Sequence, residues 1–192
     1  MTRIVLFESL TLDGVMQAPG RADEDTRGGF EHGGWAGPYS DPELAAQANR
    51  ANTAGLLLGR RTYEDFFSVW PKQKNNPYTD VLNRSQKYVA SKSLKEPLPW
   101  ENSTLLDGDA ADAVARLREQ PGGDLVVLGS GELAQSLMRN GLVDEYTLLI
   151  YPLVLGSGRR LFREDGMMAK LRLVESRTTP KGVVIGTYQP ED

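Results

Sequence analysis

Two apolar runs that end in glycine and pass directly into helical sequence constrain this chain most. The first is GLLLG (55–59), followed by RTYEDFFSVW (61–70), and the second is DLVVLG (124–129), followed by GELAQSLMRNG (131–141). Short apolar runs of this kind suit strands buried on both faces, as in a parallel sheet covered by helices. The pattern predicts an α/β protein in which strands and helices alternate.

Further segments between residues 3 and 120 follow the same pattern. We expect strands over residues 3–10, 87–91 and 103–106, and helices over residues 40–52 and 109–120. The helix at 40–52 has clear start signals, because Ser40 or Asp41 can cap it and Pro42 suits its first turn. Residues 11–41, in contrast, form a long Gly/Pro-rich loop, and a loop of this length is usually functional or disordered.

The last part of the chain has the composition of a sheet. Three strands with hairpin-like connections are predicted within VDEYTLLIYPLVLG (143–156), KLRLVESRTT (170–179) and GVVIGTYQ (182–189). The expected fold is therefore a mostly parallel central sheet with antiparallel carboxyl-terminal strands and flanking helices. The apolar segment 143–156 must be either covered within that sheet or used as an interface.

Composition narrows the classes of function. A length of 192 residues with 40% hydrophobic residues suits a single domain over residues 1–192. The net charge of −4, without a sustained Lys/Arg run, argues against nucleic-acid binding. The absence of cysteine and the single histidine, His32, exclude thiol chemistry and histidine or cysteine metal cages, so no metal is expected. No apolar run reaches membrane length, so we expect a soluble, cytoplasmic protein.

The two strand-to-helix turns predict an anion site. In open parallel sheets, ligands bind at the carboxyl ends of strands, where helices begin with free N–H groups. At the first turn, Arg60 and Arg61 add guanidinium groups that suit a phosphate monoester. The second turn offers glycines and Ser130 without a cation, which suits a diphosphate held by backbone groups. Together the turns favour a dinucleotide with an extra phosphate, NADPH rather than NADH.

Each turn also has a simpler explanation. Arg60 and Arg61 can be a solvated pair that bridges to Glu64 and Asp65. The second turn, GSGEL, is not the full dinucleotide fingerprint, and no acidic residue follows at the usual spacing for a ribose hydroxyl. The prediction therefore depends on the two turns occurring together in one sheet.

Several stretches resemble the dihydrofolate reductase-like superfamily. LLLGRRTYEDF resembles its NADPH-holding Gly-Arg turn, KYVASKSL the strand whose serine-containing end meets the adenosine 2′-phosphate, and LVVLGSGELAQSLM its glycine turn under the diphosphate. SLTLDGV and VDEYTLLIYPLVLGSGRRLF are similar to the reductase domain of the riboflavin-biosynthesis deaminase-reductase, the RibD C-terminal domain. These matches extend over nearly the whole chain.

The resemblance implies a dihydrofolate reductase-like three-layer sandwich and NADPH-dependent reduction of a small planar or pyrimidine-derived substrate, as in a 5-amino-6-(5-phosphoribosylamino)uracil reductase. It also implies a homodimer through the carboxyl-terminal region. Carried over by position, the coenzyme site uses Gly59, Arg60, Arg61, Thr62, Ser91, Lys92, Gly129, Ser130, Gly131, Glu132 and Leu133. Two of these depart from the family pattern, because Ser130 replaces the middle glycine and Glu132 adds a negative charge.

The proton donor and the substrate contacts stay open at this stage. The resemblance brings Glu43 to the place of the substrate-anchoring acid of dihydrofolate reductase, although an acid in a first helical turn is stabilising by itself. Asp13, at the mouth of the first strand, is the rival, and its alternative is a plain Asp-Gly turn. Trp35 and Tyr39 are predicted to line the substrate, because a core role is hard to arrange in a glycine-rich loop.

Two classes of function remain. The first is an NADPH-dependent reductase closer to the riboflavin pathway than to dihydrofolate reductase, because the ending PLVLGSGRRLF is typical of the riboflavin branch. The second is a non-catalytic nucleotide-binding module or sensor, which would use the same two turns. Only a productive substrate site separates the two.

Overall fold

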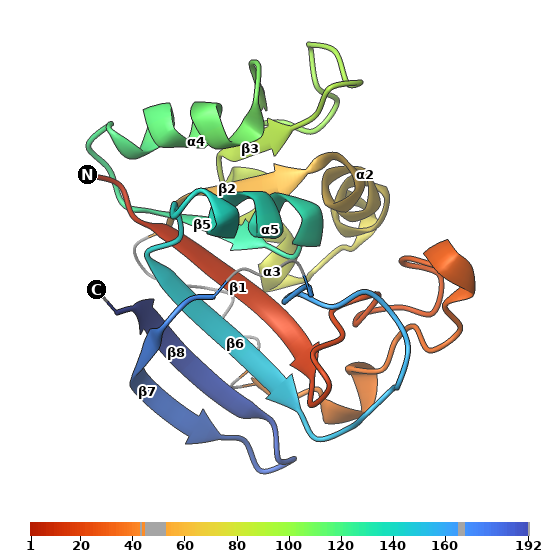
Figure 1. The fold of residues 1–192 in the computed structure, drawn as a ribbon. Coiled ribbons are helices and arrows are strands. Elements are labelled where there is room, and N and C mark those ends of the chain that lie inside the picture. The colour runs from red at the N-terminus through yellow and green to blue at the C-terminus, as the bar shows by residue number, and fades with distance from the viewer. Residues whose placement is uncertain (43, 45–52, 165–167, 192) are drawn as a thin grey trace.

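All the strands that the structure describes belong to one sheet, and helices cover both of its faces. The structure is a computed structural model and describes residues 1–42, 44, 53–164 and 168–191. The sheet has eight strands in the order β4-β3-β2-β5-β1-β6-β8-β7 (Figure 1). Their bounds are β1 (Ile4–Thr11), β2 (Thr53–Gly59), β3 (Lys87–Ala90), β4 (Ser103–Leu106), β5 (Asp124–Leu128), β6 (Glu145–Tyr151), β7 (Leu171–Thr178) and β8 (Val184–Pro190).

The directions of the strands confirm the expected sheet. From β4 to β6 every neighbouring pair is parallel. β8 is antiparallel to both of its neighbours, β6 and β7. The prediction of hairpin-like connections holds only for β7 and β8, because β8 lies between β6 and β7 in the sheet.

The strand of the apolar segment 143–156 is covered within the sheet. This strand, β6, has β1 on one side and β8 on the other, and six of its seven residues are buried. After the strand, Val154 is 66% exposed, and further exposed apolar side chains lie on the edge strand β7, where Leu173 and Val174 are about half exposed. Only the tertiary structure decides between the two roles that the sequence allows for this segment.

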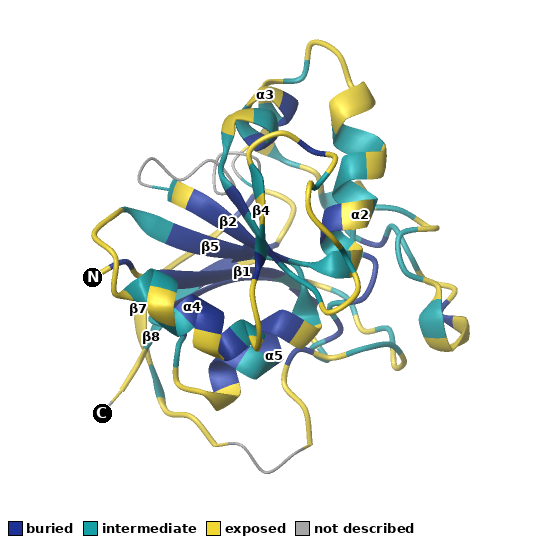
Figure 2. Cartoon of the chain, turned by 90° about the horizontal axis from the view of Figure 1, so that it is seen from above, coloured by how far each residue is buried: buried dark blue, intermediate teal, exposed yellow. Residues whose placement is uncertain are grey.

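Two hydrophobic cores lie on opposite faces of the sheet. The helices are α2 (Arg60–Val69), α3 (Pro77–Arg84), α4 (Ala110–Arg118) and α5 (Gly131–Arg139). α4 and α5 pack on one face and α2 and α3 on the other, so the molecule has three layers (Figure 2). Successive residues of β1 alternate between the cores: Ile4 and Leu6 face α5, whereas Val5 and Phe7 face α2.

Apart from α3, which the sequence analysis did not predict, the observed helices α2, α4 and α5 agree with the sequence patterns. The omitted helix is α3, which begins at Pro77 and is capped by Asn76, whose side chain accepts a 3.0 Å hydrogen bond from the Tyr78 N–H. Most of the helix expected over 40–52 lies outside the described residues. None of the helices in the described part of the chain is both long and apolar enough to cross a membrane.

The loop between β1 and residue 41 packs against the sheet. It contains two short 3-10 turns, Arg27–Gly29 and Gly37–Tyr39. Its apolar residues Val15, Phe30 and Trp35 are buried in the core on the α2 side. The loop is therefore part of the folded domain, and it brings its charged residues beside the strand ends described next.

Candidate active site

The two strand-to-helix turns lie side by side. β2 and β5 are parallel neighbours in the sheet, so Gly59 and Gly129, which end them, reach the same edge. The Ser130 hydroxyl oxygen accepts a 2.8 Å hydrogen bond from the Gly59 N–H and joins the turns directly. Ser130 has a left-handed backbone with φ of 61°. The serine that replaces the family's middle glycine therefore keeps the glycine-like conformation and adds a link.

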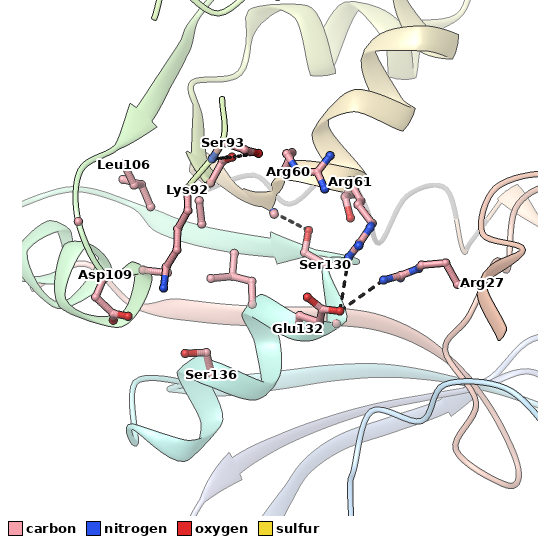
Figure 3. A pocket seen from close by; sticks show the side chains of 18 residues that line it. Arg27, Arg60, Arg61, Lys92, Ser93, Leu106, Asp109, Ser130, Glu132 and Ser136 are labelled. Atoms are coloured by element: carbon pink, nitrogen blue, oxygen red, sulfur yellow. Dashed lines mark hydrogen bonds and ion pairs between the residues drawn. The ribbon is translucent and has the colours of Figure 1, made fainter. Parts of the chain in front are cut away.

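A cavity of about 580 Å³ opens over these turns. Among the residues that line it are ten predicted to hold the coenzyme: Gly59, Arg60, Arg61, Thr62, Ser91, Lys92, Ser130, Gly131, Glu132 and Leu133. The remaining predicted residue, Gly129, lines an adjoining cavity. Arg27, Ser93 and Asp109 also line the first cavity and escaped the sequence analysis, because they come from two loops and the cap of α4 (Figure 3).

Two of the helices that begin at this cavity, α2 and α5, have no side-chain cap. No side chain of the N-cap residues Gly59 and Ser130 accepts a hydrogen bond from the first turn of α2 or α5. α3 and α4, in contrast, are capped by Asn76 and Asp109, and the start of α4 also lines this cavity. An uncapped helix start leaves backbone N–H donors free, together with the positive end of the helix dipole. The cavity therefore offers donors to an anion.

Arg60 and Arg61 point to different partners. An Nη atom of Arg60 lies 2.9 Å from an Oε atom of Glu64 one turn further along α2, as the simpler explanation predicts. Arg61 instead reaches Glu132, and Asp65 pairs with Arg21 from the long loop. Both side chains of the Arg60–Glu64 pair are more than a third exposed. Such a pair contributes about 0–1 kcal/mol, so a phosphate can replace it at little cost.

Glu132 is the centre of a cluster of three arginines. Its Oε1 atom lies 3.3 Å from Arg27, 3.5 Å from Arg61 and 3.1 Å from Arg159. The arginines come from the long loop, α2 and the loop after β6, and Figure 3 shows Arg27 and Arg61 directed at the carboxylate. The positive charges outnumber the carboxylate, although Arg27 is shared with Asp25. The negative charge that departs from the family pattern is therefore more than offset.

A second cavity, of about 700 Å³, adjoins the first and shares Ser130, Gly131 and Glu132 with it. It lies between the carboxyl end of β1, the long loop and α2. Aromatic rings form part of its wall: Phe66, Trp70, Tyr78 and Tyr151. Carboxylates form another part: Glu8, Asp23, Glu24, Asp25, Glu64 and Asp65. An aromatic wall with nearby acceptors suits a flat ring that carries N–H donors.

Glu8 is the residue of this cavity that the sequence analysis missed. It lies on β1 and is only 4% exposed, and its one hydrogen bond among the described residues comes from the Ser9 N–H at 3.2 Å. Burial raises the pKa of Glu8 to about 8, and the negative charge of Glu24 contributes in the same direction. The signal was present, because an acid interrupts the apolar run RIVLFESL.

Asp13 has a structural role. Its carboxylate accepts hydrogen bonds from the Thr11 hydroxyl at 2.6 Å and from the N–H groups of Leu155 at 3.2 Å and Gly156 at 2.9 Å. These bonds, that from Thr11 above all, lower the pKa of Asp13 to about 2. Asp13 lines neither cavity, and a carboxylate with so low a pKa holds no proton to give at neutral pH. The structure thus favours the turn interpretation; the rival candidate, Glu43, lies outside the described residues.

Trp35 and Tyr39 line neither cavity. Trp35 is 7% exposed, donates from Nε1 to the Gln17 carbonyl at 2.8 Å, and packs edge-on against Tyr151. Tyr39 packs against the same ring. The expectation that a glycine-rich loop would keep Trp35 out of the core is wrong, because the loop folds across Tyr151. Trp70 and Tyr78, whose ring centroids are 4.8 Å apart, lie at the cavity instead.

Comparison with known proteins agrees with this architecture. The RibD C-terminal domain family matches residues 2–185. The uncharacterized protein YyaP of Bacillus subtilis (strain 168) is 29% identical over 193 residues, which cover 97% of this chain and 94% of that protein.

Solved structures show the same fold. A putative riboflavin biosynthesis protein from Shewanella sp. PV-4 superposes over all of both chains with a TM-score of 0.71 and 22% identity. Dihydrofolate reductase from Enterococcus faecalis superposes over 99% of this chain and 97% of its own, with a TM-score of 0.63 and 14% identity. The fold is therefore dihydrofolate reductase-like, and the chain belongs to the RibD C-terminal domain family.

Proposed function

We propose that this protein is an NADPH-dependent reductase that holds the coenzyme in the first cavity and a small planar substrate in the second. The observation that carries the proposal is the pair of uncapped helix starts, joined by Ser130, at the floor of a cavity with basic side chains. Membership of the RibD C-terminal domain family supports a reductase-type activity, and the Enterococcus faecalis structure is described as a complex with NADP(H).

The residues of the first cavity fit a dinucleotide that carries a third phosphate. The free N–H groups at the start of α5, with Arg61 and Arg27 beside them, suit the diphosphate. Arg60, Ser91 and Lys92 lie on the β3 side and suit the 2′-phosphate. In this proposal the two arginines that the sequence analysis assigned together, Arg60 and Arg61, serve different phosphates.

The second cavity supplies the conditions for reduction. NADPH, when bound, provides a hydride for a C=N or C=O bond of the substrate. The aromatic rings of Phe66, Trp70 and Tyr151 shield a flat substrate from water. A pyrimidine-derived compound, as in the riboflavin pathway, is the first substrate class to test.

The homodimer expected from the resemblance remains a prediction. The edge strand β7 is the natural place for a second copy, since Leu173 and Val174 are exposed there and an edge strand has free backbone groups. Light scattering coupled to size exclusion measures the mass directly.

Titration of the purified protein with NADPH, and separately with NADH, tests the proposed coenzyme. Trp70 lines the adjoining second cavity, and reduced nicotinamide absorbs at the wavelengths where tryptophan emits, so quenching of tryptophan fluorescence reports coenzyme binding. We expect submillimolar affinity for NADPH and at least about tenfold weaker binding of NADH, the effect of one charge-assisted contact. Absence of binding for both coenzymes would refute the proposal.

Turnover separates the enzyme from a binding module. Loss of the reduced-nicotinamide absorbance is followed with a panel of pyrimidine and pteridine acceptors that carry C=N bonds. Oxidation of NADPH with any of them supports the reductase. Tight NADPH binding without oxidation across the panel supports a non-catalytic nucleotide-binding module instead.

A further inference from the structure

We propose that Glu8 is the proton donor of this site, acting on a nitrogen or oxygen atom of a substrate that lies in the second cavity against the carboxyl end of β1. The inference rests on the reductase function proposed above and adds a catalytic residue and the substrate chemistry that it serves. Asp13, one of the two acids that the sequence suggested, has a structural role instead, and the other, Glu43, lies outside the described residues.

Two buried glutamates on neighbouring strands show why Glu8 is unusual. Glu145, which begins β6, is 5% exposed and pairs with Arg3 at 2.5 Å. Glu8 on β1 is 4% exposed, and within the described part of the chain it has neither a cation nor a side-chain hydrogen-bond partner. A buried carboxyl with a paired cation is a structural ion, whereas one without a cation is retained at a cost in stability. That cost calls for a functional reason.

The surroundings of Glu8 keep its proton in place. β6 presents Leu148 opposite Glu8, and β5 ends beside it at Leu128, so neither strand offers a charge. The charged group of the loop that acts on the pKa of Glu8 is Glu24, a like charge. At the α2 wall Arg21 pairs with Asp65, and at the opposite wall the arginines contact Glu132. Within the described part of the chain, each arginine that lines this cavity has a carboxylate partner other than Glu8, so burial dominates and Glu8 is a neutral acid at neutral pH.

The proposed step transfers a hydride from the coenzyme and a proton from Glu8 to the substrate. Reduction of C=N adds a hydride to carbon and a proton to nitrogen, and the hydride comes from the coenzyme, which is oxidised. The proton comes from the Glu8 carboxyl: its O–H bond breaks as the N–H bond forms, and a carboxylate remains. Water reprotonates that carboxylate after the product leaves. A general acid works best when its pKa lies near the working pH, which holds for Glu8.

A second acid, Asp65, indicates that the substrate carries a hydrogen-bond donor. Asp65 Oδ2 is buried without a hydrogen-bond partner, and it is the one such side-chain atom found among the described residues. Asp65 lines the same cavity as Glu8. Buried acceptors are almost always paired, so an orphan at a cavity wall indicates a donor supplied by the ligand. We therefore expect the substrate to carry an N–H or amino group that reaches Asp65.

The decisive variant is E8Q, which keeps the shape of the side chain and removes the transferable proton. The control is E175Q, the same chemical change at an exposed position on β7. Both variants and the wild type are assayed for NADPH affinity by fluorescence and for turnover with the acceptor from the panel that the wild type reduces fastest. We expect unchanged NADPH affinity for E8Q and a loss in kcat of about 10²–10⁴-fold, with E175Q like the wild type.

A second measurement does not depend on turnover. Infrared difference spectra between wild type and E8Q, recorded from pH 6 to pH 9, show the protonation of this one carboxyl. A protonated carboxyl band at pH 7 that is absent from E8Q supports the proposal. A carboxylate at pH 7 overturns it, whatever the activity.

The outcomes also separate this proposal from the reductase function. If E8Q turns over as fast as the wild type while NADPH binds normally, only the assignment of Glu8 fails. If the wild type binds no NADPH, the proposed function fails first. Should E8Q not fold, E8N and E8D replace it: a loss in kcat for E8N that E8D does not share supports the donor role, and turnover by E8N equal to that of the wild type overturns it.

Discussion

The hydroxyl oxygen of Ser130 accepts a 2.8 Å hydrogen bond from the backbone N–H of Gly59, 71 positions earlier in the chain. This bond fixes the start of α2 against the start of α5, and the proposed coenzyme cavity opens above it. Ser130 reaches Gly59 because its backbone is left-handed, a conformation that the family's usual glycine adopts without strain. Serine at this position therefore costs backbone strain that glycine would avoid, and it gains a direct hydrogen bond between the two turns.

Two variants at Ser130 distinguish the contribution of its hydrogen bond to Gly59 from the cost of its left-handed backbone. S130A loses the hydrogen bond and keeps the left-handed backbone, so the free energy of unfolding should fall by about 0.5–1.5 kcal/mol. S130G also loses the bond but relieves a backbone cost of roughly 1 kcal/mol, so it should be close to neutral. Urea denaturation measures both. Equal losses for the two variants would contradict this account.

Arg60 and Arg61 should differ in how they discriminate between coenzymes. R60A removes the guanidinium proposed for the 2′-phosphate, so NADPH should bind about 10- to 100-fold more weakly while NADH changes little. R61A removes a charge beside the diphosphate and should weaken both coenzymes alike. Fluorescence titration measures the affinities, with R172A on the edge strand β7 as control. If R60A weakens both coenzymes equally, the phosphate positions are assigned wrongly.

Replacement of Glu132 by glutamine should strengthen coenzyme binding. E132Q frees Arg27, Arg61 and Arg159 from their shared carboxylate and removes a negative charge beside the proposed diphosphate. Glu132 is 59% exposed on its side chain, so the free energy of unfolding should change by no more than about 1 kcal/mol. Titrations at low and high salt test this: the gain should shrink at high salt, since exposed charges are screened. Weaker binding by E132Q would show that Glu132 positions the arginines.

Asp13 should stabilise the protein above about pH 4. Its folded-state pKa of about 2 lies below that of an unfolded aspartate, so its contribution is present at neutral pH and is lost as the pH falls toward 2. D13N should lower the free energy of unfolding by about 1–3 kcal/mol at pH 7, because hydrogen bonds to a charged acceptor weaken. The difference in the free energy of unfolding between the wild type and D13N, measured by denaturation, should shrink as the pH falls from 7 to 3. A constant difference across this range would exclude the ionised form as the cause.

Glu8 should affect the pH dependence of stability in the opposite direction to Asp13. Its folded-state pKa of about 8 lies above the ordinary value of 4.5, so the folded protein holds a proton that the unfolded chain releases between these values. The free energy of unfolding therefore falls with rising pH over this window, on the order of 1 kcal/mol for each pH unit. E8Q lacks this dependence, so its stability relative to wild type should rise from pH 5 to pH 8 and level off above. Parallel pH profiles would mean that Glu8 is ionised in the folded state.

The sequence by itself determined the sheet and the two turns. Apolar runs that end in glycine before a helix are local patterns, and neighbouring parallel strands bring their carboxyl ends to one edge whatever the rest of the fold does. This is why most residues predicted for the coenzyme line one cavity. α3 was omitted, although its start signal at Asn76 and Pro77 was local as well.

The tertiary structure alone decided which side chains became partners. Glu8 and Glu145 are both acids in strands; the position of Arg3 gives Glu145 an ion pair, whereas Glu8 lies at a cavity and has no cation beside it among the described residues. Trp35 is buried in the core because the long loop that carries it folds across Tyr151 of β6, far away in the sequence. The burial of a side chain and the charge beside it arise from segments far apart in the chain, and a local pattern does not contain them.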